Sequence, residues 1–198
     1  MIICVTGPMA AGKNLASSIL EEKGLASVDA DELAHRAVEN ARDKIIKEFG
    51  SLAKEKGISL LNKDGTLNRR QLGALIFSDK ALVKKQEDIV YPEINSLFDE
   101  FIQSHQGQDV IINATVLYKV PLIKKVDCII YIDAPVLQRL FRASRRDHIP
   151  LRQIRQRFRQ QRHLFSKYSS QNADIYRVWN TGTRRSLEKK LMSVLGRI

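Results

Sequence analysis

Residues 7–14, with the sequence GPMAAGKN, are the segment whose residue types and spacing most clearly indicate chemistry. Gly7 and Gly12 are separated by four residues, and Lys13 follows the second glycine directly. Glycines let a backbone turn its N–H groups toward a bound phosphate, and a lysine in this place can neutralise phosphate charge during transfer. The apolar residues 2–6 predict a buried strand before the loop, and a helix is expected to begin at Lys13. This succession of a strand, a glycine-containing loop and a helix predicts a phosphate-binding loop (P-loop) that holds ATP.

The last residue of this loop is Asn14, where the usual pattern has a serine or threonine whose hydroxyl binds Mg²⁺. The side-chain carbonyl of an asparagine can still bind a hard cation. Ser17 and Ser18 lie too far along the predicted helix to replace that hydroxyl directly. Asn14 is therefore the candidate magnesium ligand, and ATP and Mg²⁺ are the expected cofactors.

A second group of polar residues follows the predicted strand at residues 25–29, in the sequence VDAD. Ligands of parallel sheets bind at the carboxyl ends of strands, where a carboxylate such as Asp31 could take or orient the proton of an attacking hydroxyl. The alternative is that Asp29 or Asp31 only caps the following helix. A further acid would be sought at the end of the third strand, but Asn113 stands there.

The chain of 198 residues carries a net charge of +11, which favours anionic partners. Between residues 139 and 162 there are nine arginines and a single acid, Asp147. These arginines suit phosphate groups, nucleic acid or a solvated helix face. Aromatic residues make up only 7% of the chain and show no stacking pattern beside the arginines, so we expect no nucleic-acid partner.

Several features favour a cytoplasmic protein that has no membrane partner. No apolar run approaches the roughly 20 residues that a membrane-spanning helix needs. The first residues, MIICVTG, resemble a buried strand and not a signal peptide. The two cysteines, Cys4 and Cys128, lie in separate apolar runs and are expected to be reduced core residues.

The pattern of elements predicts an α/β fold. Apolar runs at residues 2–6, 25–29, 109–113, 127–133 and 174–179 predict five strands, and helical segments separate them. Helices are expected at about 13–23, 42–60 with breaks at Gly50 and Gly57, 67–77, 80–105 with a perturbation at Pro92, 135–145, 150–166 and after residue 182. We therefore expect one domain with a three-layer α/β/α core, a five-stranded and mostly parallel sheet, and an almost wholly helical insertion at 40–107.

Together with GPMAAGKN, five further stretches occur in an order that resembles dephospho-coenzyme A kinases over nearly the whole chain. They are VDADELAHR, DGTLNRRQLGALIFSD, IVYPEI, DAPVLQRLFRASRRD and ADIYRVWNTGT. The second and fourth of these five are not typical of P-loop kinases in general, so they favour this family over its relatives. The resemblance implies transfer of phosphate from ATP to the ribose 3′-hydroxyl of dephospho-CoA, which gives CoA and ADP in the last step of coenzyme A biosynthesis.

The resemblance also implies a division of the chain. A nucleotide-binding core would comprise about residues 1–39, 108–140 and 168–198, a helical CoA-binding insertion would comprise about 40–107, and a small lid would comprise about 141–167. The expected partners are dephospho-CoA and ATP, and the oligomeric state stays open between a monomer and a weak homo-oligomer.

The resemblance assigns roles to single residues. Asp31 matches the base that acts on the ribose hydroxyl, and Arg142 and Arg146 match basic lid positions that close over the transferring phosphoryl group. With Lys13 these form the expected catalytic set. The expected acceptor contacts are Asp31, Arg69, Tyr91 and Leu117. The expected ATP contacts are Gly7, Pro8, Met9, Ala10, Ala11, Gly12, Lys13, Asn14, Leu15, Arg142, Asn180 and Gly182.

The sequence departs from the family pattern at four positions. Asn14 replaces a hydroxyl residue, Tyr91 replaces a histidine, and Thr115 and Lys119 stand where the family usually has proline and glutamate. These departures concern magnesium binding and the acceptor loop. Other nucleoside monophosphate or small-molecule P-loop kinases, a weakened nucleotide-binding paralogue and an arginine-rich nucleic-acid-binding protein are the alternatives.

Overall fold

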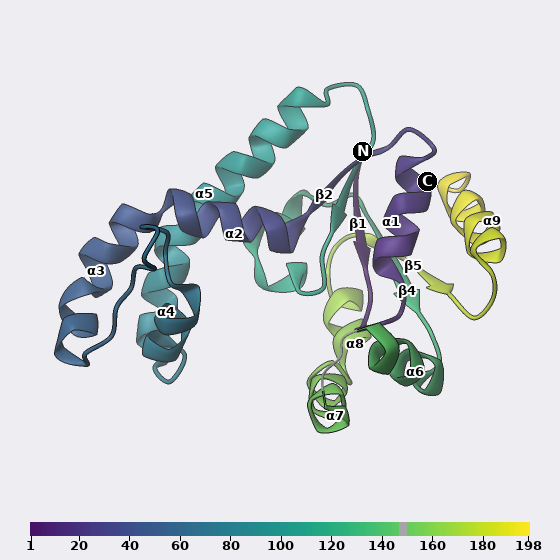
Figure 1. Ribbon diagram of the computed structural model, residues 1–198. Coiled ribbons are helices and arrows are strands. Elements are labelled where there is room, and N and C mark those ends of the chain that lie inside the picture. The colour runs from purple at the N-terminus through teal and green to yellow at the C-terminus, as the bar shows by residue number, and fades with distance from the viewer. Residues whose placement is uncertain (147–149) are drawn as a thin grey trace. The chain divides into compact units, whose positions relative to one another are not determined.

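A computed structural model describes residues 1–146 and 150–198 of the chain (Figure 1). It contains two compact units. Met1–Ala30 and His105–Ile198 form the first, which we name the sheet unit, and Asp31–Ser104 form the second, which we name the helical unit. Among the described residues, no helix is long and apolar enough to cross a membrane.

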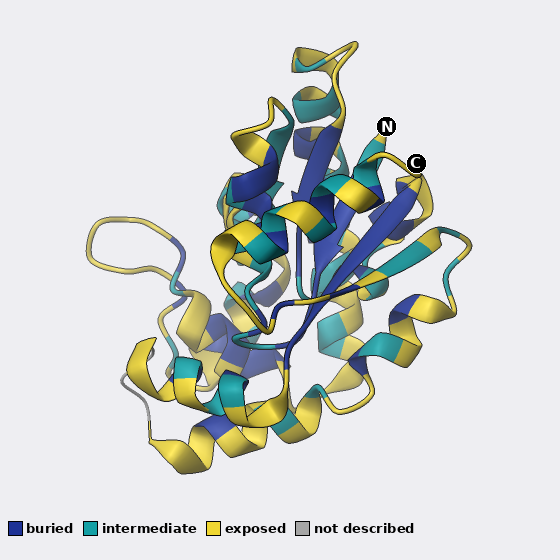
Figure 2. Ribbon diagram, turned by 90° about the vertical axis from the view of Figure 1, so that its right-hand side faces the viewer, coloured by how far each residue is buried: buried dark blue, intermediate teal, exposed yellow. Residues whose placement is uncertain are grey.

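The sheet unit contains five strands, as the apolar runs predict: β1 (Ile2–Thr6), β2 (Ala26–Asp29), β3 (Val110–Asn113), β4 (Cys128–Asp133) and β5 (Asp174–Trp179). Their order in the sheet is β2-β3-β1-β4-β5, and all four pairings are parallel. The three central strands are mostly buried, while β2 and β5 at the edges are partly exposed, as Figure 2 shows. This burial explains why the central strands are continuous apolar runs.

Helices cover the two faces of this sheet. On one face, α1 (Lys13–Glu21) and α9 (Arg184–Leu195) pack together in a core cluster with Ile130 and Ile132 of β4 (Figure 1). On the opposite face, the ring of Tyr131 contacts Phe165 and Tyr168 of α8 (Leu164–Ser169) edge to face, at centroid distances of 5.0 and 6.4 Å. Alternation along β4 thus sends neighbouring side chains into two separate layers.

The remaining elements of the sheet unit follow β3 and β4. After β3 the chain forms two short 3₁₀ helices, η1 (Leu117–Lys119) and η2 (Pro121–Lys125). After β4 it forms α6 (Val136–Arg146) and α7 (Leu151–Gln160), and then α8. The expected lid covers α7, α8 and the end of α6, and its residues 147–149 lie outside the described part of the chain.

The helical unit contains most of α2 (Ala30–Asn40), followed by α3 (Arg42–Glu55), α4 (Arg69–Ile76) and α5 (Lys80–Ser104). An isolated antiparallel bridge joins Leu61 to Leu67 before α4. The core of this unit is made by apolar faces of its helices, which include Ile45, Phe49 and Phe98.

Two sequence expectations about this unit are wrong in detail. Gly50 does not break a helix, because it lies inside α3, whose apolar face of Ile45, Phe49 and Ala53 is buried. The helix expected from residue 67 begins at Arg69, because the side chain of Asn68 caps it by accepting a hydrogen bond from the Gln71 amide. Pro92 lies inside α5 without ending that helix.

Candidate active site

The loop between β1 and α1 has a backbone shape that only glycine allows at two positions. Gly7 and Gly12 have φ angles of 155° and 102°, in the region that side chains disfavour. A Cβ atom at Gly7 would lie 2.2 Å from the carbonyl oxygen of Ile132, and one at Gly12 would lie 2.2 Å from Nδ2 of Asn180. The first turn of α1 contains no acidic side chain, so the positive end of this helix is not neutralised by its own residues. These features are those of a phosphate cradle.

Lys13 begins α1, and neighbouring amides hold its side chain. Its Nζ donates to Oδ1 of Asn113, at the end of β3, over 3.0 Å and to Oδ1 of Asn14 over 3.1 Å. The Nδ2 of Asn113 donates in turn to Oδ1 of Asn14 and to Oδ2 of Asp29, each over 3.2 Å. The ammonium group of Lys13 is therefore positioned by two neutral amides, which leave its charge available to a phosphate.

The same oxygen atoms are those that a magnesium ion would meet. The carbonyls of Asn14 and Asn113 and the carboxylate of Asp29 are hard oxygen donors, which fit Mg²⁺. Only one of the three groups is charged, and both Asn14 and Asn113 already accept a hydrogen bond from Lys13. Within residues 1–146 and 150–198 no group of three or more His, Cys, Asp or Glu side chains could hold a metal. This donor set fits an ion held mainly by nucleotide phosphates.

The other side of the loop is held by the C-terminal part of the sheet unit. Nδ2 of the buried Asn180 donates to the carbonyl of Ala11 over 2.8 Å, and its own backbone N–H donates to Asp133. Arg142 of α6 donates to the carbonyls of Asn180 over 3.1 Å and of Ala11 over 3.5 Å. The structure thus brings the loop 7–14 together with two further residues of the predicted ATP site, Arg142 and Asn180.

Met9, in the middle of the loop, has both of its backbone polar groups bound by side chains from α6 and the residue after α7. The Met9 amide donates to Oε1 of Gln161 over 2.7 Å, and the Met9 carbonyl accepts from Nε of Arg139 over 2.9 Å. Arg139 is only 8% exposed, and its burial lowers the pKa of its guanidinium. Neither residue was predicted from the sequence. Arg139 is one of the nine arginines between residues 139 and 162, which the sequence marks as a possible phosphate-binding segment. Nothing in the sequence around Gln161 indicates its contact with the loop.

The predicted residues Leu15, Leu117 and Gly182 lie outside these contacts. Leu15 packs against the core cluster of the sheet unit, and Leu117 is buried, with its backbone N–H bonded to the Tyr168 hydroxyl. Gly182 follows Asn180 in the turn before α9. Arg146 is the exposed last residue of α6, where Arg142 lies one turn earlier.

Asp31 lies in the first turn of α2, two residues after Asp29 ends β2. Carboxylates are favourable at this end of a helix, so the position by itself fits both a helix-stabilising role and a role at the carboxyl end of the sheet. Tyr91 lies on α5 and is partly buried, and this burial, together with a hydrogen bond to Glu87, raises its pKa to about 12. Its phenol therefore stays neutral at physiological pH.

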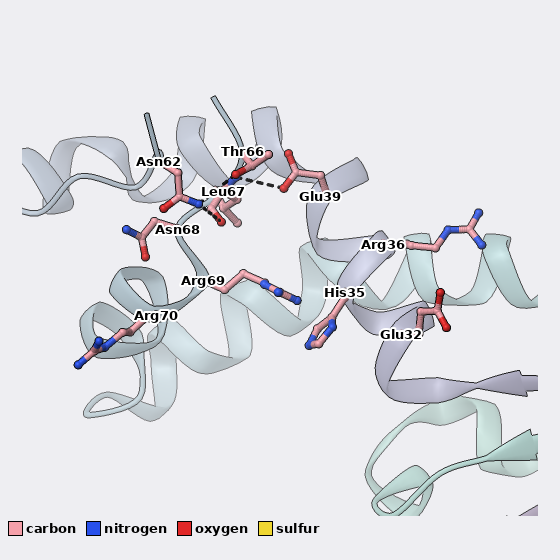
Figure 3. Close-up of a pocket in the computed structure, with 10 residues that line it drawn as sticks. All are labelled: Glu32, His35, Arg36, Glu39, Asn62, Thr66, Leu67, Asn68, Arg69 and Arg70. Carbon is pink, nitrogen blue, oxygen red and sulfur yellow. Dashed lines mark hydrogen bonds between the residues drawn. The ribbon is translucent and has the colours of Figure 1, made fainter. Parts of the chain in front are cut away.

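A pocket of the helical unit contains Arg69, as Figure 3 shows. Its volume is about 610 Å³, and its basic side chains are His35, Arg36, Arg69 and Arg70. Glu39, on the same wall, accepts a hydrogen bond from the Leu67 amide over 3.1 Å. Arg69 and Arg70 occupy the first turn of α4, where a positive charge opposes the helix dipole. Since these two arginines do not stabilise the helix, the pocket is a candidate site for an anionic group.

Comparisons with known proteins agree with this geometry. The family model for dephospho-CoA kinase matches residues 1–180. A dephospho-CoA kinase of Treponema denticola is 36% identical over 97% of this chain and 87% of its own length, and one of Treponema pallidum is 33% identical over 99% and 94%.

Solved structures show the same fold. The protein TT1252 of Thermus thermophilus superposes with a TM-score of 0.82 at 27% identity, covering 100% of this chain and 97% of its own. A dephospho-CoA kinase of Campylobacter jejuni, at 22% identity, superposes with a TM-score of 0.72 over 99% and 96% of the two chains. The glycine loop and its contacts are consistent with these matches. The family model and the two Treponema relatives show that the chain belongs to the dephospho-CoA kinase family.

Proposed function

We propose that this protein transfers the terminal phosphoryl group of ATP to the ribose 3′-hydroxyl of dephospho-CoA, giving CoA and ADP. The observation that carries the proposal is the loop at residues 7–14, in which two obligatory glycines and the positioned Lys13 form a phosphate cradle. Family membership supplies the acceptor, because a phosphate cradle alone does not distinguish among kinases.

On the nucleotide side, the loop binds the phosphates through backbone N–H groups, and Lys13 neutralises the charge that develops on the transferring group. Arg142 is held against the loop by the carbonyls of Ala11 and Asn180, which places a second positive charge at its edge. Arg146, one turn further along α6, extends the basic surface into the lid. Closure of this lid would exclude water from the reacting phosphate.

On the acceptor side, we assign to Asp31 the role of orienting the ribose hydroxyl and accepting its proton. Its place directly after β2, at the carboxyl end of the sheet, supports this role. Arg69 binds an anionic group of the acceptor, which the basic pocket around it supports. Tyr91 serves as a neutral hydrogen-bonding group of the same unit, consistent with its raised pKa.

Magnesium is the expected metal of this reaction, and when bound it supplies charge neutralisation between the phosphates. Asn14 and Asp29 are the residues that would contact it or its water ligands, because their oxygens lie around Asn113 at the base of the loop. The protein contributes little negative charge to this position, so we expect the nucleotide itself to supply most of the ion's ligands.

The test is a steady-state assay of ADP release from ATP with dephospho-CoA as the acceptor, with the mass of the product measured. We expect ADP formation that depends on dephospho-CoA and a product heavier by one phosphate group. Each nucleoside monophosphate is offered in parallel as an alternative acceptor. If turnover is faster with a nucleoside monophosphate than with dephospho-CoA, that nucleotide is the acceptor and the proposal is wrong. ADP release in the absence of any acceptor would contradict phosphoryl transfer to a metabolite.

A further inference from the structure

A cavity on the sheet unit, which adjoins the phosphate loop at Pro8, is lined by four arginines. It has a volume of about 330 Å³ and lies between β4, β5, α6 and the segment from α7 to α8. Arg139, Arg159, Arg162 and Arg177 line it, and Asp133 is the single acid among its described lining residues, so among these residues positive charges exceed negative ones by three. Like charges confined around one cavity repel each other unless an anion joins them. We propose that this cavity, which we name the arginine cavity, binds the phosphate groups of a small anionic ligand.

Two of the four guanidinium groups are held in place by aromatic rings and polar partners. Arg139 lies 4.4 Å above the ring of Phe158 and donates to the Met9 carbonyl. Arg177 lies 5.0 Å above the ring of Phe165 and donates from Nε to Asp133 over 3.0 Å. A guanidinium that is already stacked and bonded loses little freedom when an anion arrives. This part of the cavity is therefore organised before a ligand binds.

The other two arginines are available for a ligand. Arg159 and Arg162 are exposed, and neither guanidinium group makes a hydrogen bond or ion pair with any residue in the described ranges. They lie at the end of α7 and just beyond it, on the wall that carries Gln161. Guanidinium groups bind phosphate through paired N–H donors, so two such groups facing one cavity suit phosphate or pyrophosphate better than a single carboxylate.

The arginine cavity adjoins the ATP loop, but neither Lys13 nor Asn14 lines it. Lys13 and Asn14 point to Asn113 at the end of β3, on one side of β1, whereas the cavity lies beyond β4, on the other side of β1. Pro8 is the one residue of the loop 7–14 that lines it. Its wall residue Tyr131 faces α8, opposite to the side of the sheet on which α1 packs. A ligand here would be a second anion beside the nucleotide.

The test measures binding of inorganic pyrophosphate to the full chain by titration calorimetry. We expect two sites per chain in the unaltered protein. The double variant Arg159→Ala with Arg162→Ala should raise the Kd of one site by about 10-fold or more, because charge-assisted hydrogen bonds are lost. The control variant Arg152→Ala with Arg155→Ala removes the same charge from exposed positions of the same helix that do not line the cavity, and should leave both sites intact.

A second readout comes from Trp179, the only tryptophan of the chain. Arg177 lies 4.6 Å above its ring, so movement of this guanidinium toward a bound anion should change the tryptophan fluorescence. This change should saturate in the control and be absent from the cavity variant. Circular dichroism and Tm of both variants verify that the fold is intact. Equal pyrophosphate affinity in the two variants, or a single site that Lys13→Ala removes, would overturn the proposal.

The origin of the natural ligand is decided by competition with dephospho-CoA. If dephospho-CoA displaces pyrophosphate from the arginine cavity, the phosphate groups belong to the acceptor. If both bind together, they belong to a separate phosphorylated effector. These measurements need no phosphoryl transfer, so a failure of the proposed reaction and a failure of this site are distinguishable.

Discussion

The phosphate loop of the sheet unit and the basic pocket of the helical unit present two different ways to bind an anion. In the loop, the cradle is made by backbone geometry at Gly7 and Gly12, and Lys13 supplies one charged side chain. In the pocket, positive charge comes from Arg36, Arg69 and Arg70, long side chains on α2 and at the start of α4, beside the carboxylates of Glu32 and Glu39 (Figure 3). One site is therefore built from the main chain, and the other from side chains.

The two sites therefore differ in how they tolerate substitutions and changes in salt concentration. A backbone cradle has no room for new atoms, since a Cβ at Gly12 would lie 2.2 Å from the Asn180 amide. Backbone donors also keep their positions at any ionic strength. A cluster of exposed side chains accommodates substitutions in small steps, but its attraction weakens as salt shortens the screening length to about 10 Å at 0.1 M. Four substitutions test whether the two sites differ in this way.

The largest effect is expected from Lys13→Ala, which removes the charged side chain of the loop itself. Its Nζ donates hydrogen bonds to Asn14 and Asn113 and is thereby held at the loop. We expect loss of measurable ADP release, with circular dichroism unchanged. The matched control is Lys23→Ala near the other end of α1, where the lysine forms an exposed ion pair with Glu188. Robust turnover without Lys13 would remove the loop from the mechanism.

Asp31→Asn tests whether the first acid of the helical unit acts in the reaction or only stabilises α2. We expect kcat to fall by about 10²–10⁴-fold, with Tm little changed. Asp43→Asn is the control, because Asp43 also lies in the first turn of a helix, α3, and its loss likewise removes a favourable charge there, together with an exposed ion pair to Arg42. If both variants lose stability equally and both keep wild-type turnover, Asp31 is only a helix-stabilising residue.

Arg69→Gln tests the side-chain site. We expect the KM for dephospho-CoA to rise by about 10-fold at low salt, with kcat changed less, because one charge-assisted hydrogen bond to the acceptor is lost. The difference between variant and wild type should shrink as salt is raised, which a purely structural defect would not do. Lys47→Gln, an exposed lysine of α3 outside the pocket, provides the control. A salt-independent effect, or an equal effect of both variants, would contradict the assignment.

The smallest effect is expected from Asn14→Thr, which restores the hydroxyl that P-loops usually carry. Oδ1 of Asn14 now accepts hydrogen bonds from Lys13 and Asn113, and a cation has to compete with these donors. We expect the concentration of Mg²⁺ that gives half-maximal ATP binding to fall by about two- to tenfold. Calorimetric titration of ATP with and without Mg²⁺ measures this shift. An unchanged requirement for magnesium would show that position 14 does not contact the ion or its ligands.

The strands could be predicted from sequence because the central ones are buried on both faces and must be apolar throughout. The loop could be predicted because its glycines are required by local geometry. The bond from Lys13 to Asn113 could not, since the two residues are 100 positions apart and meet only through strand order. Gln161 was missed for the same reason, because its contact with Met9 spans 152 positions. The helix break predicted at Gly50 is wrong, because burial of one face of α3 outweighs the free-energy cost of a glycine inside a helix.

The contact between Gly12 and Asn180 also has a consequence for the order of synthesis on the ribosome. β1 is made well before its partner strands, because it pairs with β3 and β4, whose residues begin at Val110 and Cys128. The carbonyl of Ala11 then finds its partner only when Asn180 has been made. A nascent chain that ends before this residue therefore lacks the clamp that holds the loop. Because these pairings are so distant along the chain, the ability to bind nucleotide arises only after Asn180 has been made.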